Sequence, residues 1–189
     1  NKLNQKIKKF FLILSNFLNK NILMTKEEGE KIIIFIYLSK NSKIEVDTWE
    51  LIAYFLENSD TYSVYVPKLM HNGMIPVKYQ NVFTKNKYGS LECVNTNKNN
   101  ETQDIIIPDI VITPLFTFNI DGNFIGYGGG YYDKYFNELE SIKRIMCLNN
   151  NKTYKVGLSF GNHTQDVWKV ENHDVKMDYV VTSTKIYEF

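Results

Sequence analysis

The sequence predicts a single α/β domain over residues 1–189, built on a mainly parallel β-sheet that helices cover on both faces. Three observations lead to this prediction. A chain of 189 residues suits one domain and is short for two. Several short, continuous apolar runs are typical of strands that are buried on both faces. Stretches with apolar residues at helical spacing alternate with those runs, as they do in α/β folds.

In the first part of the chain we expect a helix, a strand and a second helix. Apolar residues recur at helical spacing from Leu3 to Phe17 and predict an amphipathic helix that packs on the core, with a membrane- or partner-binding helix as the alternative. Residues 31–38 (KIIIFIYL) form a continuous apolar run and predict a strand in the middle of a sheet. Residues 45–56 predict a helix, with Asp47 or Thr48 as its N-cap.

The middle of the chain predicts two strands and then an irregular segment. Residues 62–66 predict a strand that Pro67 ends, and residues 73–79 predict a shorter one. Residues 81–104 are the least patterned part of the chain and include a polar run of low complexity (NTNKNN). We expect residues 81–104 to be a surface insertion within the domain, because a strand pattern resumes directly afterwards.

The last part of the chain predicts three strands, a hairpin and a helix. The strands are expected at residues 109–113, 155–160 and 178–182. The pair Asp121-Gly122 is a strong turn signal and predicts a β-hairpin over residues 116–125. A glycine-rich run follows the hairpin and leads into a helix whose apolar face holds Tyr132, Phe136 and Leu139.

The composition excludes several classes of protein. Apolar residues make up 43% of the chain and charged residues 23%, so the chain can bury a core and is not disordered throughout. The net charge of +1 creates no field that favours nucleic acid or an anionic membrane surface. The longest apolar run near the start, at residues 10–14, is far shorter than the ~20 residues of a membrane span. We therefore expect neither nucleic acid nor a membrane as a partner.

The cysteines and the start of the chain bear on the compartment. Cys93 and Cys147 are too few for a secreted disulfide scaffold. No small-residue cleavage site follows the lysines and apolar residues near the start, so we expect no signal peptide. We predict a cytoplasmic protein, with an organelle as the alternative, and a monomer.

A glycine-rich loop is the strongest candidate for a binding site. Four glycines fall within five positions, at 126, 128, 129 and 130, and glycine in regular structure costs roughly 0.5–1 kcal/mol. Such a cluster is expected where backbone N–H groups at a helix N-terminus come close to an anion such as phosphate. The alternative is a flexible exit from the hairpin. Two known phosphate-binding patterns do not fit, because each requires a different residue where Tyr131 stands.

Asp133 follows the glycines within the first turn of the expected helix. A carboxylate at that place can stabilise the positive end of the helix dipole. It can also hold Mg²⁺, because Mg²⁺ is bound by one or two carboxylates together with phosphates of a substrate. The residue types alone leave both alternatives open.

Three motifs of the second half occur in a distinctive order: residues 108–114 (PDIVITP), the turn at Asp121-Gly122 and the octapeptide at residues 126–133 (GYGGGYYD). Together they closely resemble the 5-formyltetrahydrofolate cyclo-ligase family, whose members are also called methenyltetrahydrofolate synthetases. The resemblance extends over residues 31–185, and the octapeptide is its most specific part. Weaker matches lie, in the family's order, at residues 37–39, 45–48, 66–68, 74, 88–92, 156–158 and 173–178.

The resemblance implies a three-layer α/β/α fold and a ligase reaction that depends on ATP and Mg²⁺. In the family, the N5-formyl oxygen of 5-formyltetrahydrofolate attacks the γ-phosphate of ATP, and N10 then closes the ring and expels phosphate. The products are 5,10-methenyltetrahydrofolate, ADP and phosphate. The implied partners are therefore two small molecules, 5-formyltetrahydrofolate and ATP.

The resemblance also assigns roles to residues of this chain. The ATP-binding residues that it implies are Gly126, Tyr127, Gly128, Gly129, Gly130, Tyr131 and Tyr132. The folate-binding residues that it implies are Leu38, Glu45, Met74, Tyr127, Gly128, Gly129, Gly130 and Tyr131. It implies that Asp133 and Asp174 hold Mg²⁺, and that Tyr131 and Asp133 are catalytic.

For four of these residues a structural role is an alternative. Asp174 could belong to an ordinary acidic turn, and Glu45 could stabilise the first turn of the helix expected at residues 45–56. Leu38 and Met74 could be core residues without contact to a ligand.

The chain departs from the family pattern at basic residues. The family's N-terminal Lys-x-x-x-Arg is not matched after Lys2, and we expect the family's first helix to be missing or diverged. Phe124 and Lys68 stand where arginine is usual, and lysine lacks the bidentate fork of arginine. These departures leave an alternative function, a folate- or nucleotide-binding protein of the same fold that has lost turnover.

Overall fold

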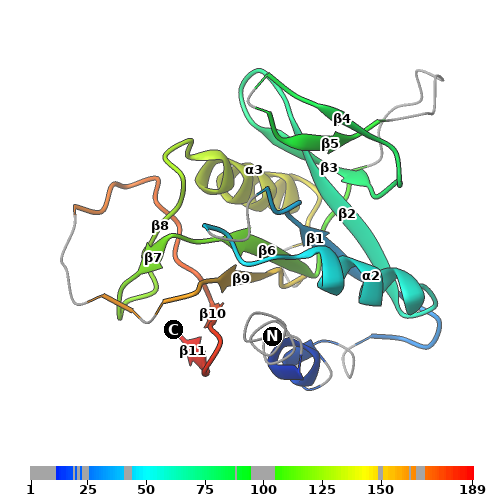
Figure 1. Cartoon of the computed structure of the whole chain (residues 1–189), viewed down its shortest axis with the longest axis horizontal. Coiled ribbons are helices and arrows are strands. Elements are labelled where there is room, and N and C mark those ends of the chain that lie inside the picture. The colour runs from blue at the N-terminus through cyan, green and yellow to red at the C-terminus, as the bar shows by residue number, and fades with distance from the viewer. Residues whose placement is uncertain are drawn as a thin grey trace.

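The computed structural model describes residues 12–18, 20, 22, 26–40, 44–87, 89–94, 105–148, 151–161, 163–164 and 169–189. A seven-stranded sheet crosses the centre of the molecule (Figure 1). Its strands are β1 (Ile32–Ile36), β2 (Tyr62–Leu69), β3 (Met74–Lys78), β6 (Ile110–Pro114), β9 (Tyr154–Leu158), β10 (Tyr179–Val181) and β11 (Ile186–Glu188). In space their order is β11-β10-β9-β6-β1-β2-β3.

The sheet is mainly parallel, which confirms the prediction. The strands from β10 through β9, β6 and β1 to β2 pair in parallel. The edge strands β3 and β11 pair antiparallel with β2 and β10. Parallel neighbours need connections that cross a face of the sheet, and two helices lie in these connections.

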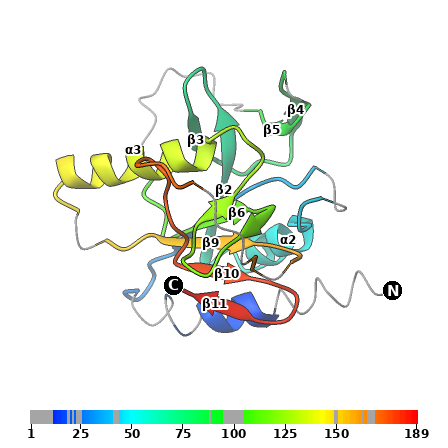
Figure 2. The same ribbon diagram turned by 90° about the vertical axis from the view of Figure 1, so that its left-hand side faces the viewer.

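Alternate residues of β1 contact helices on opposite faces of the sheet. Ile34 and Ile36 are buried together with α2 (Trp49–Glu57) and the helical segment 12–18, whereas Phe35 is buried together with α3 (Tyr131–Ile145). Figure 2 shows α3 on one side of the sheet and the other two helical segments on the opposite side. The three-layer α/β/α fold is therefore confirmed. In the part of the chain that the structure describes, no helix combines the length and the apolar character needed to cross a membrane.

Residues 12–18 are helical and overlap the segment from Leu3 to Phe17 that was predicted to be a helix, whereas residues 1–11 lie outside the described residues. Leu14, Phe17 and Leu18 are buried against the sheet. The ring of Phe17 packs edge-on against Tyr179, with 4.5 Å between the ring centroids. For these residues, the prediction of a helix that packs on the core is confirmed.

Helix α2 begins at Trp49, later than the predicted start at residue 45. Thr48 is the N-cap residue of α2, one of the two residues predicted for that position. Its hydroxyl makes no capping bond to the helix and donates to Tyr37 O at 2.7 Å instead. Asp47 Oδ1 accepts a hydrogen bond from Trp49 N at 2.9 Å. The residues before α2 are thus bonded to the chain that leaves β1, and this tertiary contact replaces the first predicted turn.

Strand β2 continues through Pro67 to Leu69, so the prediction that this proline ends the strand is wrong. Pairing with β1 stops at Tyr65. Beyond that point β2 pairs only with β3, and Pro67 lies opposite Pro76. Proline is tolerated where a strand has a neighbour on one side only, because its missing N–H then interrupts no ladder.

Two hairpins extend from the sheet. The hairpin predicted around Asp121-Gly122 is confirmed as β7 (Thr117–Phe118) and β8 (Phe124–Ile125). The other consists of β4 (Phe83–Lys85) and β5 (Leu91–Cys93) and lies within residues 81–104, where no strand was predicted. Residues 95–104 of that segment lie outside the described residues.

Side-chain contacts attach the β4–β5 hairpin to the rest of the domain. The ring of Phe83 packs edge-on against Trp49 and Tyr79, with centroid distances of 5.7 and 5.8 Å. The Cys93 thiol donates to Gln80 O at 3.1 Å. Cys93 is buried and Cys147 exposed, and both are free thiols.

Candidate functional site

A cavity of about 920 Å³ opens at the carboxyl ends of three parallel strands. Leu38 follows β1, Leu69 ends β2 and Pro114 ends β6, and all three residues line the cavity. Open parallel sheets bind their ligands beyond the carboxyl ends of their strands. The volume lies near the upper end of the range for small-molecule pockets, about 300–1,000 Å³. The cavity can therefore take a large ligand.

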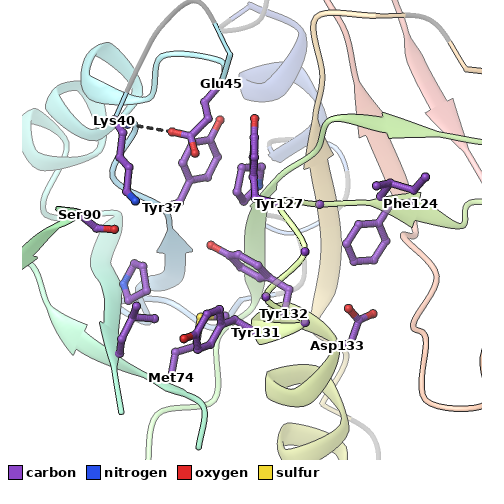
Figure 3. Close-up of a pocket in the computed structure, with 18 of the residues that line it drawn as sticks. Tyr37, Lys40, Glu45, Met74, Ser90, Phe124, Tyr127, Tyr131, Tyr132 and Asp133 are labelled. Atoms are coloured by element: carbon purple, nitrogen blue, oxygen red, sulfur yellow. Dashed lines mark hydrogen bonds between the residues drawn. The ribbon is translucent and has the colours of Figure 1, made fainter. Parts of the chain in front are cut away.

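All of the predicted site residues line this cavity. They are Leu38, Glu45, Met74, Gly126, Tyr127, Gly128, Gly129, Gly130, Tyr131, Tyr132, Asp133 and Asp174. In Figure 3, Glu45 and Asp133 lie at opposite sides of the cavity, with Tyr127 and Tyr132 between them and Tyr131 beside Met74. The fold thus brings together residues from the end of β1, the segment before α2, the start of β3, the glycine-rich loop with the first turn of α3, and the segment before β10. Leu38 and Met74 are also buried in the two core clusters, so their side chains serve the core as well as the cavity surface.

The glycine-rich loop presents backbone N–H groups at the start of α3. Gly128 and Gly130 have φ values of +83° and +59°, which favour glycine, and Gly130 is the N-cap of α3. Lys134 N donates to Gly130 O at 3.1 Å and makes the first hydrogen bond of the helix. The first N–H groups of an α-helix have no acceptor within the helix itself, and Tyr132 and Asp133 stand in this first turn of α3. A helix N-terminus of this kind favours an anion.

Gly129 is required for a different reason, which is the position of the Tyr131 ring. A Cβ atom at residue 129 would lie 2.7 Å from two atoms of that ring. Real Cβ atoms essentially never come so close to another atom. Figure 3 shows the Tyr131 ring between Met74 and Tyr132. The absence of a side chain at Gly129 therefore lets the ring lie against the loop at the centre of the cavity.

Glu45 lies before α2 and faces the cavity. Its Oε2 accepts a hydrogen bond from Lys40 N at 2.8 Å. The residue stands outside the helix, so the alternative that Glu45 stabilises the first helical turn is wrong. Its carboxylate still has lone pairs that can accept from a ligand N–H group.

Two tyrosine hydroxyls hold the segment that carries Glu45. Tyr37 donates to Val46 O at 2.6 Å, and Tyr127 of the glycine-rich loop donates to Ile44 O at 3.0 Å. Burial, and then the Glu45 charge, raise the pKa of Tyr127 to about 12. The same two causes raise the pKa of Tyr37 well above its usual value. Both phenols are therefore protonated at neutral pH and act as hydrogen-bond donors.

Asp133 and Asp174 lie close together at the other side of the cavity. Asp133 Oδ1 accepts a hydrogen bond from Val175 N at 3.1 Å. Burial raises the pKa of Asp133, and the negative charge of Asp174 raises it further. Asp174 Oδ2 accepts from Glu171 N at 2.8 Å, so Asp174 also takes part in a turn. Two carboxylates whose charges repel form a place where a cation is favourable.

The two aspartates fit Mg²⁺ better than a metal that needs an all-protein ligand set. Among the described residues, no group of three or more His, Cys, Asp or Glu side chains is arranged to hold a metal. Mg²⁺ does not need such a group, because it usually retains waters and takes only one or two carboxylates together with substrate phosphates. The adjacent helix N-terminus supplies N–H donors for such phosphates.

Comparison with known proteins identifies the family of the chain. The model of the 5-formyltetrahydrofolate cyclo-ligase family matches residues 12–183 of the chain. The chain belongs to this family. The resemblance found in the sequence is thereby confirmed, and it includes the glycine-rich octapeptide that lines the cavity.

Individual cyclo-ligases match over shorter stretches. The 5-formyltetrahydrofolate cyclo-ligase of Mus musculus is 34% identical over 73 residues, which cover 39% of this chain and 33% of the mouse protein. The Escherichia coli K12 enzyme of the same name is 31% identical over 81 residues, covering 43% of this chain and 40% of that protein. The chain thus spans only a third to two-fifths of the length of these relatives.

A solved structure shows the same fold. The NMR structure of Aquifex aeolicus 5,10-methenyltetrahydrofolate synthetase superposes with a TM-score of 0.58 at 20% identity. The superposition covers 98% of this chain and 83% of that chain. It supports the three-layer architecture of a cyclo-ligase.

For this family member, sequence reasoning missed one whole side of the cavity. Asn86, Ser90, Leu91 and Glu92 of the β4–β5 hairpin line it, although the segment 81–104 was predicted to be a surface insertion. The signal was the weak match at residues 88–92, to which no role was given. The hairpin is therefore part of the site.

Glu92 joins the β4–β5 hairpin to the end of β2. Its Oε1 accepts hydrogen bonds from Leu69 N at 3.0 Å and from Asn86 Nδ2 at 2.9 Å. Both donor residues also line the cavity. Glu92 thus fixes the distance between two sides of the cavity.

The positive charges at the cavity come from positions that the family pattern does not mark. Lys40 and Lys169 are the lysines among the described lining residues, and sequence reasoning gave neither a role. Phe124 does line the cavity, but Lys68 is absent from its lining, and Lys2 lies outside the described residues. Acidic groups outnumber the lysines here, which favours a ligand that arrives together with a cation.

Proposed function

We propose that the chain converts 5-formyltetrahydrofolate to 5,10-methenyltetrahydrofolate in a reaction that depends on ATP and Mg²⁺ and releases ADP and phosphate. The observation that carries the proposal is the shared cavity. A helix N-terminus, a pair of carboxylates and the half-buried carboxylate of Glu45 all face it. Membership of the cyclo-ligase family supports this choice over other reactions of the same architecture.

The proposed chemistry has two steps. The formyl oxygen attacks the γ-phosphorus of ATP, the bond to ADP breaks, and an imino-phosphate forms. N10 then attacks the formyl carbon, the new C–N bond closes the ring, phosphate leaves, and the N10 proton passes to solvent. An amide-like oxygen leaves poorly, and phosphorylation makes it a good leaving group.

The chain's residues supply alignment and charge stabilisation in this proposal. The N–H groups of Tyr131, Tyr132 and Asp133 bind phosphate oxygens, and the pair Asp133 and Asp174 holds Mg²⁺. When bound, Mg²⁺ offsets the charge that develops on the transferred phosphoryl group. Positioning and fixed charges of this kind account for most catalysis of phosphoryl transfer.

The folate is proposed to lie on the side of Glu45 and Met74. The Glu45 carboxylate accepts from the polarised N–H edge of the pterin, and Leu38 and Met74 contact its apolar parts. Tyr131 is the first residue of α3, and it lies beside Met74 in Figure 3. In this proposal it therefore contacts both ligands, where the formyl oxygen meets the γ-phosphate. This arrangement accounts for the assignment of Tyr131 as a catalytic residue.

A conversion assay tests the proposal. The purified chain is mixed with 5-formyltetrahydrofolate, and the near-ultraviolet absorbance of the methenyl product is followed with ATP and Mg²⁺, and with each of them left out. We expect product only in the complete mixture. A melting temperature that rises with folate while no product forms would instead support the alternative, a binding protein that has lost turnover.

A further inference from the structure

The carboxylate of Asp174 depends for its position on an irregular segment. Residues 169–178 contain no helix or strand, and β10 begins only at Tyr179. Within the segment, Asp174 N donates to Glu171 O at 3.0 Å and Asp174 Oδ2 accepts from Glu171 N at 2.8 Å. These local bonds shape the turn but do not attach it to α3, which carries Asp133. The separation of the two carboxylates must therefore be set by other contacts.

Two hydrogen bonds attach this turn to α3. One runs from Val175 N to Asp133 Oδ1 at 3.1 Å. The other runs from Asn137 Nδ2 to His173 O at 2.9 Å. The Asn137 amide also donates to Asp133 O at 2.9 Å. An amide NH₂ group has two hydrogens, so it can make both bonds at once.

The two hydrogen bonds differ in whether a carboxylate oxygen is the acceptor. The bond from Val175 occupies an oxygen of Asp133, which is the group proposed to hold the cation. A cation bound at Oδ1 of Asp133 would weaken the bond from the Val175 N–H group, because both draw on the same oxygen. The bond from Asn137 uses only backbone oxygens as acceptors, so it persists when both carboxylates bind a cation.

Electrostatics make such an attachment necessary. Asp133 and Asp174 repel each other while no cation lies between them, and Asp174 is on the more mobile type of structure, an exposed turn without regular hydrogen bonding. A turn that moved away from α3 would relieve the repulsion but separate the ligands. The Asn137 bond opposes this movement before the cation arrives.

We propose that Asn137 is a positioning residue for the cation site, which holds the backbone of His173 so that the carboxylate of Asp174 stays beside that of Asp133. The inference rests on the proposed function, because it takes these two aspartates as the Mg²⁺ ligands. Asn137 itself touches neither the metal nor a substrate. Its role resembles that of the outer hydrogen-bond partners that orient ligands in metal sites.

Ser141 provides a matched control. It lies one turn further along α3, is exposed, and its hydroxyl donates to Asn137 O at 2.9 Å within the same helix. Alanine is a good helix former, so both Asn137→Ala and Ser141→Ala leave α3 intact. Only Asn137→Ala removes a bond to the segment that carries Asp174.

The test measures metal binding apart from turnover. Mn²⁺ prefers the same oxygen ligands as Mg²⁺ and is visible by electron paramagnetic resonance. Free Mn²⁺ is titrated with each protein in the presence of a non-hydrolysable ATP analogue and without folate. We expect Asn137→Ala to weaken Mn²⁺ binding by about five- to tenfold, at or just below the usual range for outer partners because this bond is exposed.

Turnover adds a second readout. The Mg²⁺ concentration for half-maximal rate should rise by the same factor in Asn137→Ala, while kcat at saturating Mg²⁺, the KM for folate and the melting temperature stay near those of the unchanged protein. Ser141→Ala should match the unchanged protein in every measurement.

Three outcomes would overturn the inference. Equal Mn²⁺ affinity in the two alanine variants refutes the role of Asn137 and leaves the cation site itself in place. A lower melting temperature of Asn137→Ala together with weaker folate binding shows a role in folding instead. Mn²⁺ affinity that Asp133→Asn leaves unchanged refutes the aspartate site, and the inference fails with it.

Discussion

Replacing Gly129 by alanine tests whether the glycine-rich loop serves to place the Tyr131 ring. The φ angle of Gly129 is not in the left-handed region, so alanine fits the backbone without strain. The added methyl group would lie 2.7 Å from atoms Cδ2 and Cε2 of the Tyr131 ring. The substitution therefore acts on that ring and not on the path of the loop.

The structure gives the size of the displacement. Ordinary contact begins at 3.4 Å, so the ring must retreat from 2.7 to 3.4 Å, a movement of about 0.7 Å. A misplacement of about 1 Å near the reacting atoms can lower a rate on the order of a hundredfold. We expect Gly129→Ala to lower kcat for methenyl formation by roughly ten- to a hundredfold. The melting temperature should change little, because the methyl group meets only this one side chain.

Two neighbouring glycines act as controls in the same conversion assay. At Gly126 a Cβ would meet its nearest atom only at 4.0 Å, so Gly126→Ala should stay within about twofold of the unchanged protein. At Gly128 a Cβ meets no atom within 4 Å but φ is +83°, so Gly128→Ala isolates backbone strain of roughly 1–2 kcal/mol. If Gly129→Ala had the kinetics of Gly126→Ala, the ring-placement argument would be refuted.

Three further substitutions address the other parts of the cavity. Because burial, and then Asp174, raise the pKa of Asp133, the folded chain binds a proton there more tightly than the unfolded chain, and metal-free stability should increase as pH falls through that raised pKa. In the presence of a chelator at pH 7, the melting temperature of Asp133→Asn should therefore equal or exceed that of the unchanged protein, and this difference should vanish near about pH 4. The turnover of Asp133→Asn with Mg²⁺ should fall by at least about a hundredfold, and full turnover would exclude the metal role. Glu45→Gln should weaken 5-formyltetrahydrofolate binding by one to two powers of ten in calorimetry and leave ATP binding unchanged, since it presents an NH₂ group where an acceptor is wanted; equal folate affinity would return Glu45 to a structural role. Glu92→Ala removes the acceptor of Leu69 N and should destabilise the fold by about 1–3 kcal/mol in denaturant unfolding. Ser90 of the β4–β5 hairpin lies on the Met74 side of the cavity in Figure 3, where folate is proposed to bind, so the KM for folate should rise more than the KM for ATP. An equal rise for both ligands would count against a contact between the hairpin and folate.

The predictable parts of the fold are those whose local structure is determined by residue type alone. The run at residues 31–38 is apolar on both faces and became β1, the centre of the parallel sheet. Asp121-Gly122 determines a tight turn, and the hairpin around it followed. The residue types of the glycine-rich octapeptide predicted a loop that opens a helix, and the same octapeptide was the most specific part of the family resemblance.

Elements that depend on tertiary contacts were not predictable in the same way. The strands of the β4–β5 hairpin are three residues each, too short for an alternating pattern, and ring contacts of Phe83 attach the hairpin to the domain. The start of α2 moved because Thr48 bonds to Tyr37. Such contacts join residues that are distant in sequence, and a local pattern carries no record of them.

The residues of the candidate site likewise divide into those that the sequence predicted and those that only the folded structure identifies. The glycines and Asp133 are contiguous, so their convergence could be expected from the sequence. The resemblance supplied Glu45, Met74 and Asp174, but no pattern indicated that Glu92 or Asn137 support them. Glu92 accepts from the backbone of Leu69 and Asn137 donates to the backbone of His173, and the choice of such partners depends on the folded geometry.

The position of β1 in the sheet has a consequence for the order of events during synthesis. Among the strands that the structure describes, β1 is made first, yet it lies between β2 and β6 in the middle of the sheet. A nascent chain that ends after β6 can pair these strands and already holds the Glu45 side of the cavity. It leaves the other edge of β6, with the buried residues Ile110 and Ile112, without its partner β9. Such an apolar edge is prone to association with other chains.

That edge stays unprotected until the ribosome has added the glycine-rich loop, α3 and β9. Asp174 and β10 follow later still, so the side of the cavity that holds Asp133 and Asp174 is completed only after they have emerged. A ligand that contacts both Leu38 and Asp174 then connects the earliest and the latest parts of the chain. Its binding free energy therefore stabilises the assembled sheet as a whole against unfolding.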